Sequence, residues 1–244
     1  YFFYNCDNIA NVKLPNTLEF LGESAFEGIS SLKEIELPSS LTGMGVDVFN
    51  GTGLQKVIIN GTVVGKAMFL GCNDLIEVEL TENCKTIKTE AFGDCSSLIK
   101  ITIPKSVTEI QEGAFSNTDL TDVYLYFNSV ADNYTGYPTG VTKHYLDNPH
   151  WDCGEQGDNV TAELDNNTGV LTVKGTGRMA DYKAARLTPW GKLSSYISSV
   201  VIENGVTYIG NYAFTDCDGA YRGGDGLGSV VIANTVTEVG NYSF

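Results

Sequence analysis

One short segment gathers residue types that do chemistry. The segment "HYLDNPHWDC" contains His144, Asp147, His150, Asp152 and Cys153. His150 and Cys153, with His144 upstream, could supply three ligands to a zinc ion, and a cysteine beside a histidine could act as a nucleophile. Both kinds of site need a further group, for which the sequence offers no evident candidate. The sequence also lacks a Ser-His-Asp signature, a phosphate loop and a dinucleotide fingerprint, so we expect no enzyme and no cofactor.

The elements that would position such residues belong to a repeat. The stretch from Ala91 to Phe115 begins and ends with the same Ala-Phe pair. The recurring phenylalanine lies at Phe3, Phe26, Phe49, Phe69, Phe92 and Phe115, with separations of 23, 23, 20, 23 and 23 residues. A period of this length predicts a solenoid. The short third repeat lacks residues in the turn after its strand, where a deletion is tolerated.

Each repeat also carries a short apolar motif that ends in alternation, as in Leu98-x-x-Ile101-x-Ile103. Alternation of this kind predicts a β-strand. A proline follows directly at Pro15, Pro38 and Pro104, and ends the ladder because it has no backbone donor. A coil of 23 residues cannot bury its own apolar side, so we expect the coils to stack strand beside strand, with one internal column of phenylalanines.

Most of the cysteines fit the same repeat. Cys6, Cys72, Cys95 and Cys217 each lie three residues after a repeating phenylalanine, which predicts a packing position. Cys72 and Cys95 occupy successive coils and could approach the distance of a disulfide. Cys84 replaces an apolar repeat residue and is expected in the core.

The array stops after Phe115 and restarts before Phe214, 99 residues later. We divide the chain into a first array of about six repeats (1–127), an irregular connector (128–153), a capping β-hairpin (154–195) and a truncated second array (196–244). The connector is rich in Asn, Asp, Gly, Pro and Tyr. Two alternating segments around "DNNTG" predict the hairpin, which could cap the raw end of the second array. The expected fold class is a β-rich, right-handed, leucine-rich-repeat-like stack.

The repeat resembles the BspA-type leucine-rich repeat family of bacterial surface and secreted proteins. Its signature, "L-x-x-I-x-I-P-x-x-V-x-x-I-G-x-x-A-F-x-x-C", is matched from Leu98 through Phe115, with departures at Gln111 and Thr118. The piece that begins at Cys153-Gly154 and includes Pro189-Trp190 is similar to one that often precedes such repeats, which favours a structural role for Cys153. Together the resemblance covers about residues 1–125 and 153–244. It implies surface display, adhesion or protein binding, and it names no partner.

The outward positions of the strands form the strand face, which is the candidate functional surface. If Val123 and Leu125 point inward, Asp122 and Tyr124 point outward, and the equivalent residues make two rows. One row is Asn11, Glu34, Lys56, Glu77, Lys100, Asp122, Ser199 and Ser229; the other is Lys13, Glu36, Ile58, Glu79, Thr102, Tyr124, Val201 and Val231. The candidate binding residues are Lys13, Glu36, Lys56, Ile58, Glu79, Lys100, Thr102, Asp122, Tyr124, Val201 and Val231. Outward apolar residues often mark contacts, unless the connector or an adjacent hairpin covers them.

Charge narrows the class of partner. Thirty acidic and fifteen basic residues give a net charge of −15, which disfavours nucleic acid and anionic membranes. No run of 18 apolar residues occurs, so we expect no membrane insertion. The solenoid, the lack of an assembled catalytic set and what the resemblance implies together lead us to expect an extracellular or cell-surface, non-catalytic module. We expect it to bind a protein or cell-surface polymer through the strand face. The alternatives are a passive spacer in a larger protein and a zinc or thiol enzyme at His150 and Cys153.

Overall fold

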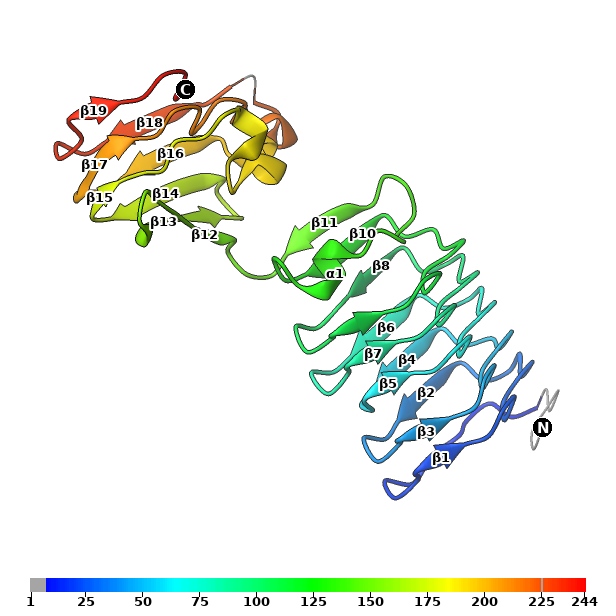
Figure 1. Ribbon diagram of the computed structural model, residues 1–244. Helices are drawn as coiled ribbons and strands as arrows, with labels where there is room; N and C mark the ends of the chain where they lie inside the picture. Colours follow the sequence, from blue (N-terminus) through cyan, green and yellow to red (C-terminus); the bar gives the residue numbers. More distant parts are fainter. Residues whose placement is uncertain (1–7, 225) are drawn as a thin grey trace. The chain divides into compact units, whose positions relative to one another are not determined.

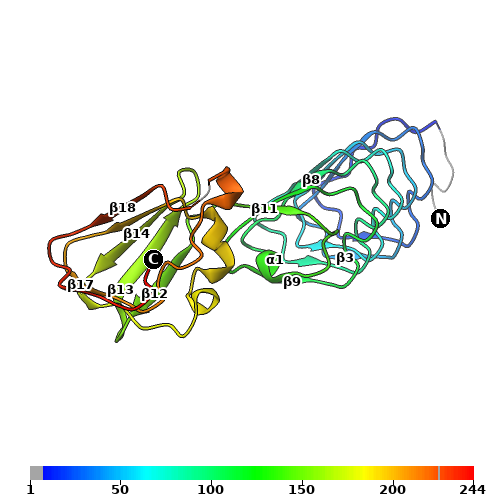
Figure 2. The ribbon, with the colours of Figure 1, turned by 90° about the horizontal axis from the view of Figure 1, so that it is seen from above.

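The computed structural model describes residues 8–224 and 226–244, so Phe3 and Cys6 lie outside the described residues. The chain forms two compact units, Tyr1–Leu146 and Asp147–Phe244 (Figure 1). Figure 2 shows the coils of the first unit stacked one behind another. No helix among the residues described is long and apolar enough to cross a membrane.

The first unit is a solenoid of short parallel strands, as the repeat predicts. One sheet contains β2 (Glu34–Leu37), β4 (Lys56–Ile59) and β6 (Glu77–Leu80), and a second contains β8 (Lys100–Thr102), β10 (Asp122–Leu125) and β11 (Thr142–Tyr145). The other side of the coils carries β1 (Phe20–Leu21) paired with β3 (Gly43–Met44), and a sheet of β5 (Val63–Val64), β7 (Thr86–Ile87) and β9 (Glu109–Ile110). The predicted leucine-rich-repeat-like class is confirmed.

The repeating phenylalanines form one internal column. The rings of Phe49 and Phe69 are 5.6 Å apart and within 9° of parallel, and Phe69 and Phe92 are 5.5 Å apart and within 8°. The column continues to Phe26 at one end and Phe115 at the other. These side chains are almost completely buried, and each contributes about 1.5–3 kcal/mol through burial of its apolar surface.

The segment 128–153 differs from the irregular connector that the sequence predicts. It contains the short helix α1 (Val130–Asn133), and β11, which pairs in parallel register with β10. Tyr137 stacks on Phe115 with ring centroids 5.5 Å apart, so a tyrosine takes the next place in the column. A further, degenerate coil therefore closes the first unit.

The second unit begins with antiparallel strands and continues as a parallel stack. Its main sheet has the order β12 (His150–Gly154), β13 (Gly157–Asp165), β14 (Val170–Gly175), β16 (Ser199–Ile202) and β18 (Ser229–Ile232). β13 and β14 form the hairpin around "DNNTG", and β14 pairs in parallel with β16. A smaller sheet contains β15 (Gly177–Arg178), β17 (Val206–Ile209) and β19 (Glu238–Val239), and the 3₁₀ helices are η1 (Ala185–Leu187), η2 (Gly191–Tyr196) and η3 (Ala220–Arg222).

The described cysteines are free and buried. The thiols of Cys72 and Cys95 are not joined; they donate to the backbone carbonyl oxygens of Phe49 and Phe69, both at 3.1 Å. Burial raises the pKa of the Cys72 thiol to about 11. These residues fill packing positions of the coil.

Candidate functional site

The pairing register of the first unit sets which side chains share the strand face. Alternation along each strand turns one set of residues into the core and the other outward. The first outward row contains Glu34, Lys56 and Glu77 on one sheet and Lys100, Asp122 and Thr142 on the other; the second row contains Glu36, Ile58 and Glu79, then Thr102, Tyr124 and His144. Ten of these residues were expected in the rows from sequence, and Thr142 and His144 were not. Lys13 is exposed but lies on no strand.

Carboxylates predominate on this face. Glu34, Glu36, Glu77 and Glu79 are exposed. Lys56 Nζ lies 2.6 Å from Glu77 Oε1, and this hydrogen bond raises the pKa of Lys56. Because the pair is open to solvent, it contributes little to stability, but it fixes the position of both charges.

An aromatic pair lies at the β10–β11 end of the strand face. The rings of Tyr124 and His144 are stacked, with centroids 4.6 Å apart and planes 16° apart. His144 Nε2 lies 2.6 Å from Asp122 Oδ1, and Thr121 Oγ1 donates to Asp122 Oδ2 at 2.7 Å. Both hydrogen bonds lower the pKa of Asp122, and the bond with His144 has the larger effect. Asp122 therefore holds the imidazole against the tyrosine ring.

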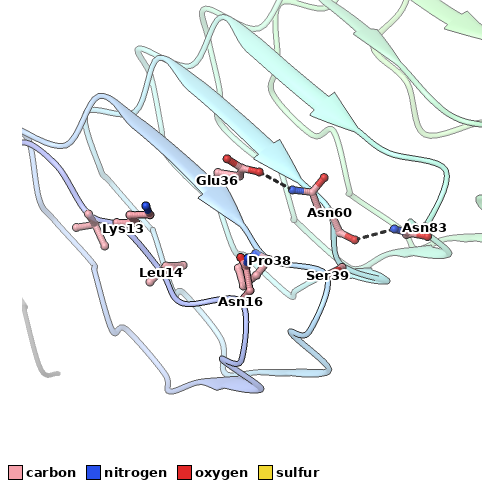
Figure 3. Close-up of a pocket in the computed structure, with 9 residues that line it drawn as sticks. Lys13, Leu14, Asn16, Glu36, Pro38, Ser39, Asn60 and Asn83 are labelled. Carbon is pink, nitrogen blue, oxygen red and sulfur yellow. Dashed lines mark hydrogen bonds between the residues drawn. The ribbon is translucent and has the colours of Figure 1, made fainter.

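Two of the hollows on or beside this face contain candidate binding residues. One, of about 420 Å³, lies between β6 and β8 and is lined by Ile76, Glu77, Val78, Lys100, Ile101, Thr102 and Tyr124. The other, of about 690 Å³, lies at the ends of β2 and β4 (Figure 3). Its lining is mainly polar: Asn60 Nδ2 donates to Glu36 Oε1 at 3.0 Å, and Asn83 Nδ2 donates to the Asn60 carbonyl oxygen at 3.3 Å. Lys13 also lines this second hollow.

The second unit has a strand face of its own. Val201 of β16 pairs directly with Val231 of β18, as their equivalent repeat positions predict. Val201 is half-buried, whereas Val231 is 56% exposed and lines a shallow hollow of about 460 Å³ with Glu203 and Asn204. The exposed valine is the apolar feature of this face.

The residues of "HYLDNPHWDC" are divided between the two units. His144 belongs to the first unit and pairs with Asp122, whereas His150 and Cys153 belong to β12 of the second. On β12, His150 is exposed and Cys153 is 2% exposed, since residues three apart on a strand point to opposite faces. Burial raises the pKa of the Cys153 thiol to about 12, so it is protonated at neutral pH. Within the described residues, no three His, Cys, Asp or Glu side chains are grouped to hold a metal ion.

The sequence pattern does not place His144 on the strand face, because β11 breaks the apolar alternation. The register places Lys143 and Tyr145 at the inward positions, opposite Val123 and Leu125 of β10. Lys143 Nζ contacts the backbone carbonyl oxygen and the side chain of Asp132, and Tyr145 Oη donates to Asp132 Oδ1 at 3.0 Å. The available signal was the spacing, because His144 follows Tyr124 by 20 residues, as Phe69 follows Phe49.

Comparison with protein families gives a match to the BspA-type leucine-rich repeat region in six copies, over residues 1–121 and 193–244. The chain belongs to the BspA-type leucine-rich repeat family. The matched residues include strands β1 to β9 of the first unit and β16 to β19 of the second. A comparison with curated proteins gives no match.

Solved structures of bacterial leucine-rich repeat proteins are similar to this chain. One from Eubacterium ventriosum and one from Bacteroides ovatus are each 25% identical over 58% of this chain, with TM-scores of 0.41 and 0.39 and coverage of 42% and 49% of their own chains. A leucine rich cell surface protein from Faecalibacterium prausnitzii is 23% identical over 94% of this chain and 56% of its own, with a TM-score of 0.35. The chain thus spans about half the length of these proteins.

Proposed function

We propose that the chain is a non-catalytic, extracellular interaction module of a bacterial surface protein, and that its strand face binds a protein with a basic surface. Membership of a repeat family of binding modules supports a non-catalytic role. The similar protein from Faecalibacterium prausnitzii is a cell surface protein, which supports the location.

The observation that carries the proposal is the composition of the two outward rows. The strands of the first unit present five carboxylates, Glu34, Glu36, Glu77, Glu79 and Asp122, against the ammonium groups of Lys56 and Lys100. Ile58 and Tyr124 lie among these charges. Acidic groups around a few apolar and aromatic residues complement a basic protein, because charge steers the encounter and apolar contacts supply affinity. The net charge of −15 acts in the same direction.

A binding screen with matched charge reversals tests this proposal. The folded chain is screened against host matrix proteins, mucins and neutral bacterial surface polymers. The test variant is Glu36→Lys/Glu79→Lys on the strand face, and the control is Glu19→Lys/Glu112→Lys, which changes the net charge equally at exposed positions outside it.

We expect the test variant to weaken binding of a basic protein at least about tenfold and the control to change it less than about twofold. Equal losses in the two variants would mean that net charge alone drives association and would contradict a strand-face site. If no partner binds the wild-type chain, the passive spacer becomes the better account. Binding of a neutral polymer that neither variant weakens would contradict the choice of a basic protein.

A further inference from the structure

The strand face of the first unit has a junction between its two sheets. β6 is an edge of the sheet β2-β4-β6, and β8 is an edge of the sheet β11-β10-β8. The two strands are neighbours, yet no ladder joins them within the described part of the chain. The hollow of about 420 Å³ lies over this junction, and this volume is within the range of ligand sites.

The β10 side of the hollow is a fixed aromatic wall. Tyr124 lines the hollow, and the His144 ring covers one face of the tyrosine. On the other side, the strand partner of Tyr124 is Thr102, whose short side chain leaves room beside the ring. Because Asp122 holds His144 in place, the tyrosine is already ordered before any ligand arrives, which lowers the entropic cost of binding.

The β6 side of the hollow presents apolar surface. Ile76 lines the hollow and is 54% exposed. Val78 is half-buried, whereas its counterparts Val57 and Ile101 are almost fully buried. An exposed isoleucine beside an ordered tyrosine is typical of the centre of a protein interface.

The charges around the hollow favour a basic segment. Glu79 is exposed on β6, and Glu77 of the same strand lines the hollow with its carboxylate paired to Lys56. Lys100 also lines the hollow but is close enough to Asp122 to contribute to lowering its pKa. A neutral sugar would stack on Tyr124 and leave Ile76 in contact with water, so this isoleucine favours a peptide.

We propose that this hollow receives one large apolar side chain of a partner protein, presented by a segment with lysine or arginine beside it. The inference rests on the proposed function of the strand face and adds the position and chemistry of its central contact. It assigns Tyr124 and Ile76 as the walls and Thr102 as the opening. Glu79 is the partner of the basic residues, beside the existing Lys56–Glu77 pair.

The test uses the full chain with labelled isoleucine and valine methyl groups, observed by NMR. The probes are the blocked peptide Lys-Gly-Phe-Gly-Lys, the same peptide with Ser in place of Phe, and the neutral sugar cellotetraose. We expect the Phe peptide to shift the methyl signals of Ile76 and Val78 saturably. Binding of the Ser peptide should be at least about tenfold weaker, since this peptide has no phenylalanine ring to bury in the hollow. Cellotetraose should leave both signals in place.

A pair of variants locates the response. Thr102→Trp fills the hollow from its opening, and Thr172→Trp makes the same change on a strand of the second unit. We expect Thr102→Trp to abolish the difference between the Phe and Ser peptides and Thr172→Trp to preserve it. Unchanged methyl signals far from position 102 would establish that the first variant is folded.

Three outcomes would overturn the proposal. Equal affinity for the Phe and Ser peptides would mean that charge attraction alone binds them and that the hollow receives no apolar side chain. The proposed function of the strand face would still stand. A shift caused by cellotetraose and not by the Phe peptide would assign the hollow to a sugar. No shift of the Ile76 and Val78 methyl signals with any probe would show that the hollow is not a binding site. The proposed function is tested separately, by the binding screen with charge-reversal variants.

Discussion

The indole ring of Trp190 stacks on the ring of Phe214, with centroids 5.5 Å apart and planes 10° apart. Trp190 is completely buried, and its Nε1 donates to the Ala213 carbonyl oxygen at 2.8 Å. Phe214 stacks in turn on Phe244 at 5.2 Å. Trp190 thus takes the place of the repeating phenylalanine, and the aromatic column of the second unit begins one coil before the Ala-Phe pair of Phe214.

Replacing Trp190 should separate the contribution of the ring from that of its hydrogen bond. Trp190→Ala should lower the free energy of unfolding of the second unit by about 3–5 kcal/mol because it leaves a cavity in the column. Trp190→Phe keeps a ring there and should cost about 1–3 kcal/mol for the buried carbonyl that loses its partner. Urea unfolding followed by fluorescence of Trp151 reports this unit, since the chain has only these two tryptophans. Equal costs for the two variants would contradict the stacking argument.

The sequence predicted coils wherever the repeat residue was a phenylalanine and failed where another aromatic residue replaced it. The strands from Glu34 to Leu125 and the outward rows followed from alternation, which is a direct property of extended backbone. The coils with Tyr137 and Trp190 lie outside this prediction, because the expected period contains phenylalanine alone. Periodicity gives the position of a residue within the coil. Whether phenylalanine, tyrosine or tryptophan can share that position depends on the similarity of their side chains.

The sequence predicts part of the candidate site, as it predicts part of the fold. Tyr124 was recognised as an outward aromatic residue, but its stacking partner His144 lies on a strand whose inward positions are Lys143 and Tyr145. Those inward residues are acceptable only because Asp132 of α1 contacts both, and this is a tertiary contact that no local pattern contains. The hollow over the β6–β8 junction likewise depends on how two strands pair.

Tyr137 closes the first column with a hydroxyl group that has no hydrogen-bond partner among the described residues. Burial of this group raises the pKa of the phenol. Tyr137→Phe should therefore raise the stability of the first unit by about 1–3 kcal/mol, because it removes an unsatisfied polar atom and keeps the ring. Hydrogen exchange of the β10 amides measures the change.

Neighbouring Tyr134 supplies the control for this prediction. Its hydroxyl donates to the Gln111 carbonyl oxygen at 3.2 Å, so Tyr134→Phe should lower stability by about 0.5–1.5 kcal/mol. A loss of similar size in Tyr137→Phe would mean that this hydroxyl has a partner in solution, such as an ordered water molecule.

A left-handed backbone conformation recurs two residues before the repeating phenylalanine. The φ angle is 49° at Ala67, 55° at Glu90 and 71° at Gly113. Side chains with a Cβ are strained in this region by about 1–2 kcal/mol, and glycine avoids the strain. We expect Gly113→Ala to lower the thermal midpoint of the first unit and Ala67→Gly to leave it unchanged or raise it. A rise caused by Gly113→Ala would contradict the strain argument.

Cys72 occupies the position that threonine takes in other coils. Thr52 and Thr118 donate from Oγ1 to the carbonyl oxygens of Phe49 and Phe115, both at 2.9 Å. We therefore expect Cys72→Thr to change stability by less than about 1 kcal/mol, and Cys72→Ala to cost about 1–2 kcal/mol through lost packing and a lost hydrogen bond.

The burial of Cys72 also predicts how its thiol reacts. Because burial raises the pKa of its thiol to about 11, a thiol reagent at pH 8 should modify it only after unfolding. Modification by mass spectrometry at increasing urea concentration measures this. Rapid labelling of Cys72 in the folded chain would show that the coil opens locally.

The ionisation of Asp181 should make the stability of the second unit depend on pH, and the direction of this dependence follows from its hydrogen bonds. Its Oδ1 accepts hydrogen bonds from the Asn211 backbone N–H at 2.9 Å and from the Tyr208 hydroxyl at 2.7 Å, and these bonds, the backbone one first, lower the pKa of Asp181. The unfolded carboxyl has its ordinary pKa of about 3.9, so the ionised form is favoured more in the folded state than in the unfolded one. Its stabilising contribution is present above that pH and is lost as the pH falls through the lowered folded value.

Asp181→Asn should therefore flatten the fall in stability of the second unit below about pH 4 and lower its stability at neutral pH. The measurement is urea unfolding by tryptophan fluorescence at a series of pH values. Asp158→Asn is the control, since Asp158 is an exposed aspartate of the same unit. If Asp181→Asn and the wild-type chain lose stability in parallel as the pH falls, the hydrogen bonds to Asn211 and Tyr208 do not favour the ionised carboxylate, and the acid sensitivity of this unit comes from other groups.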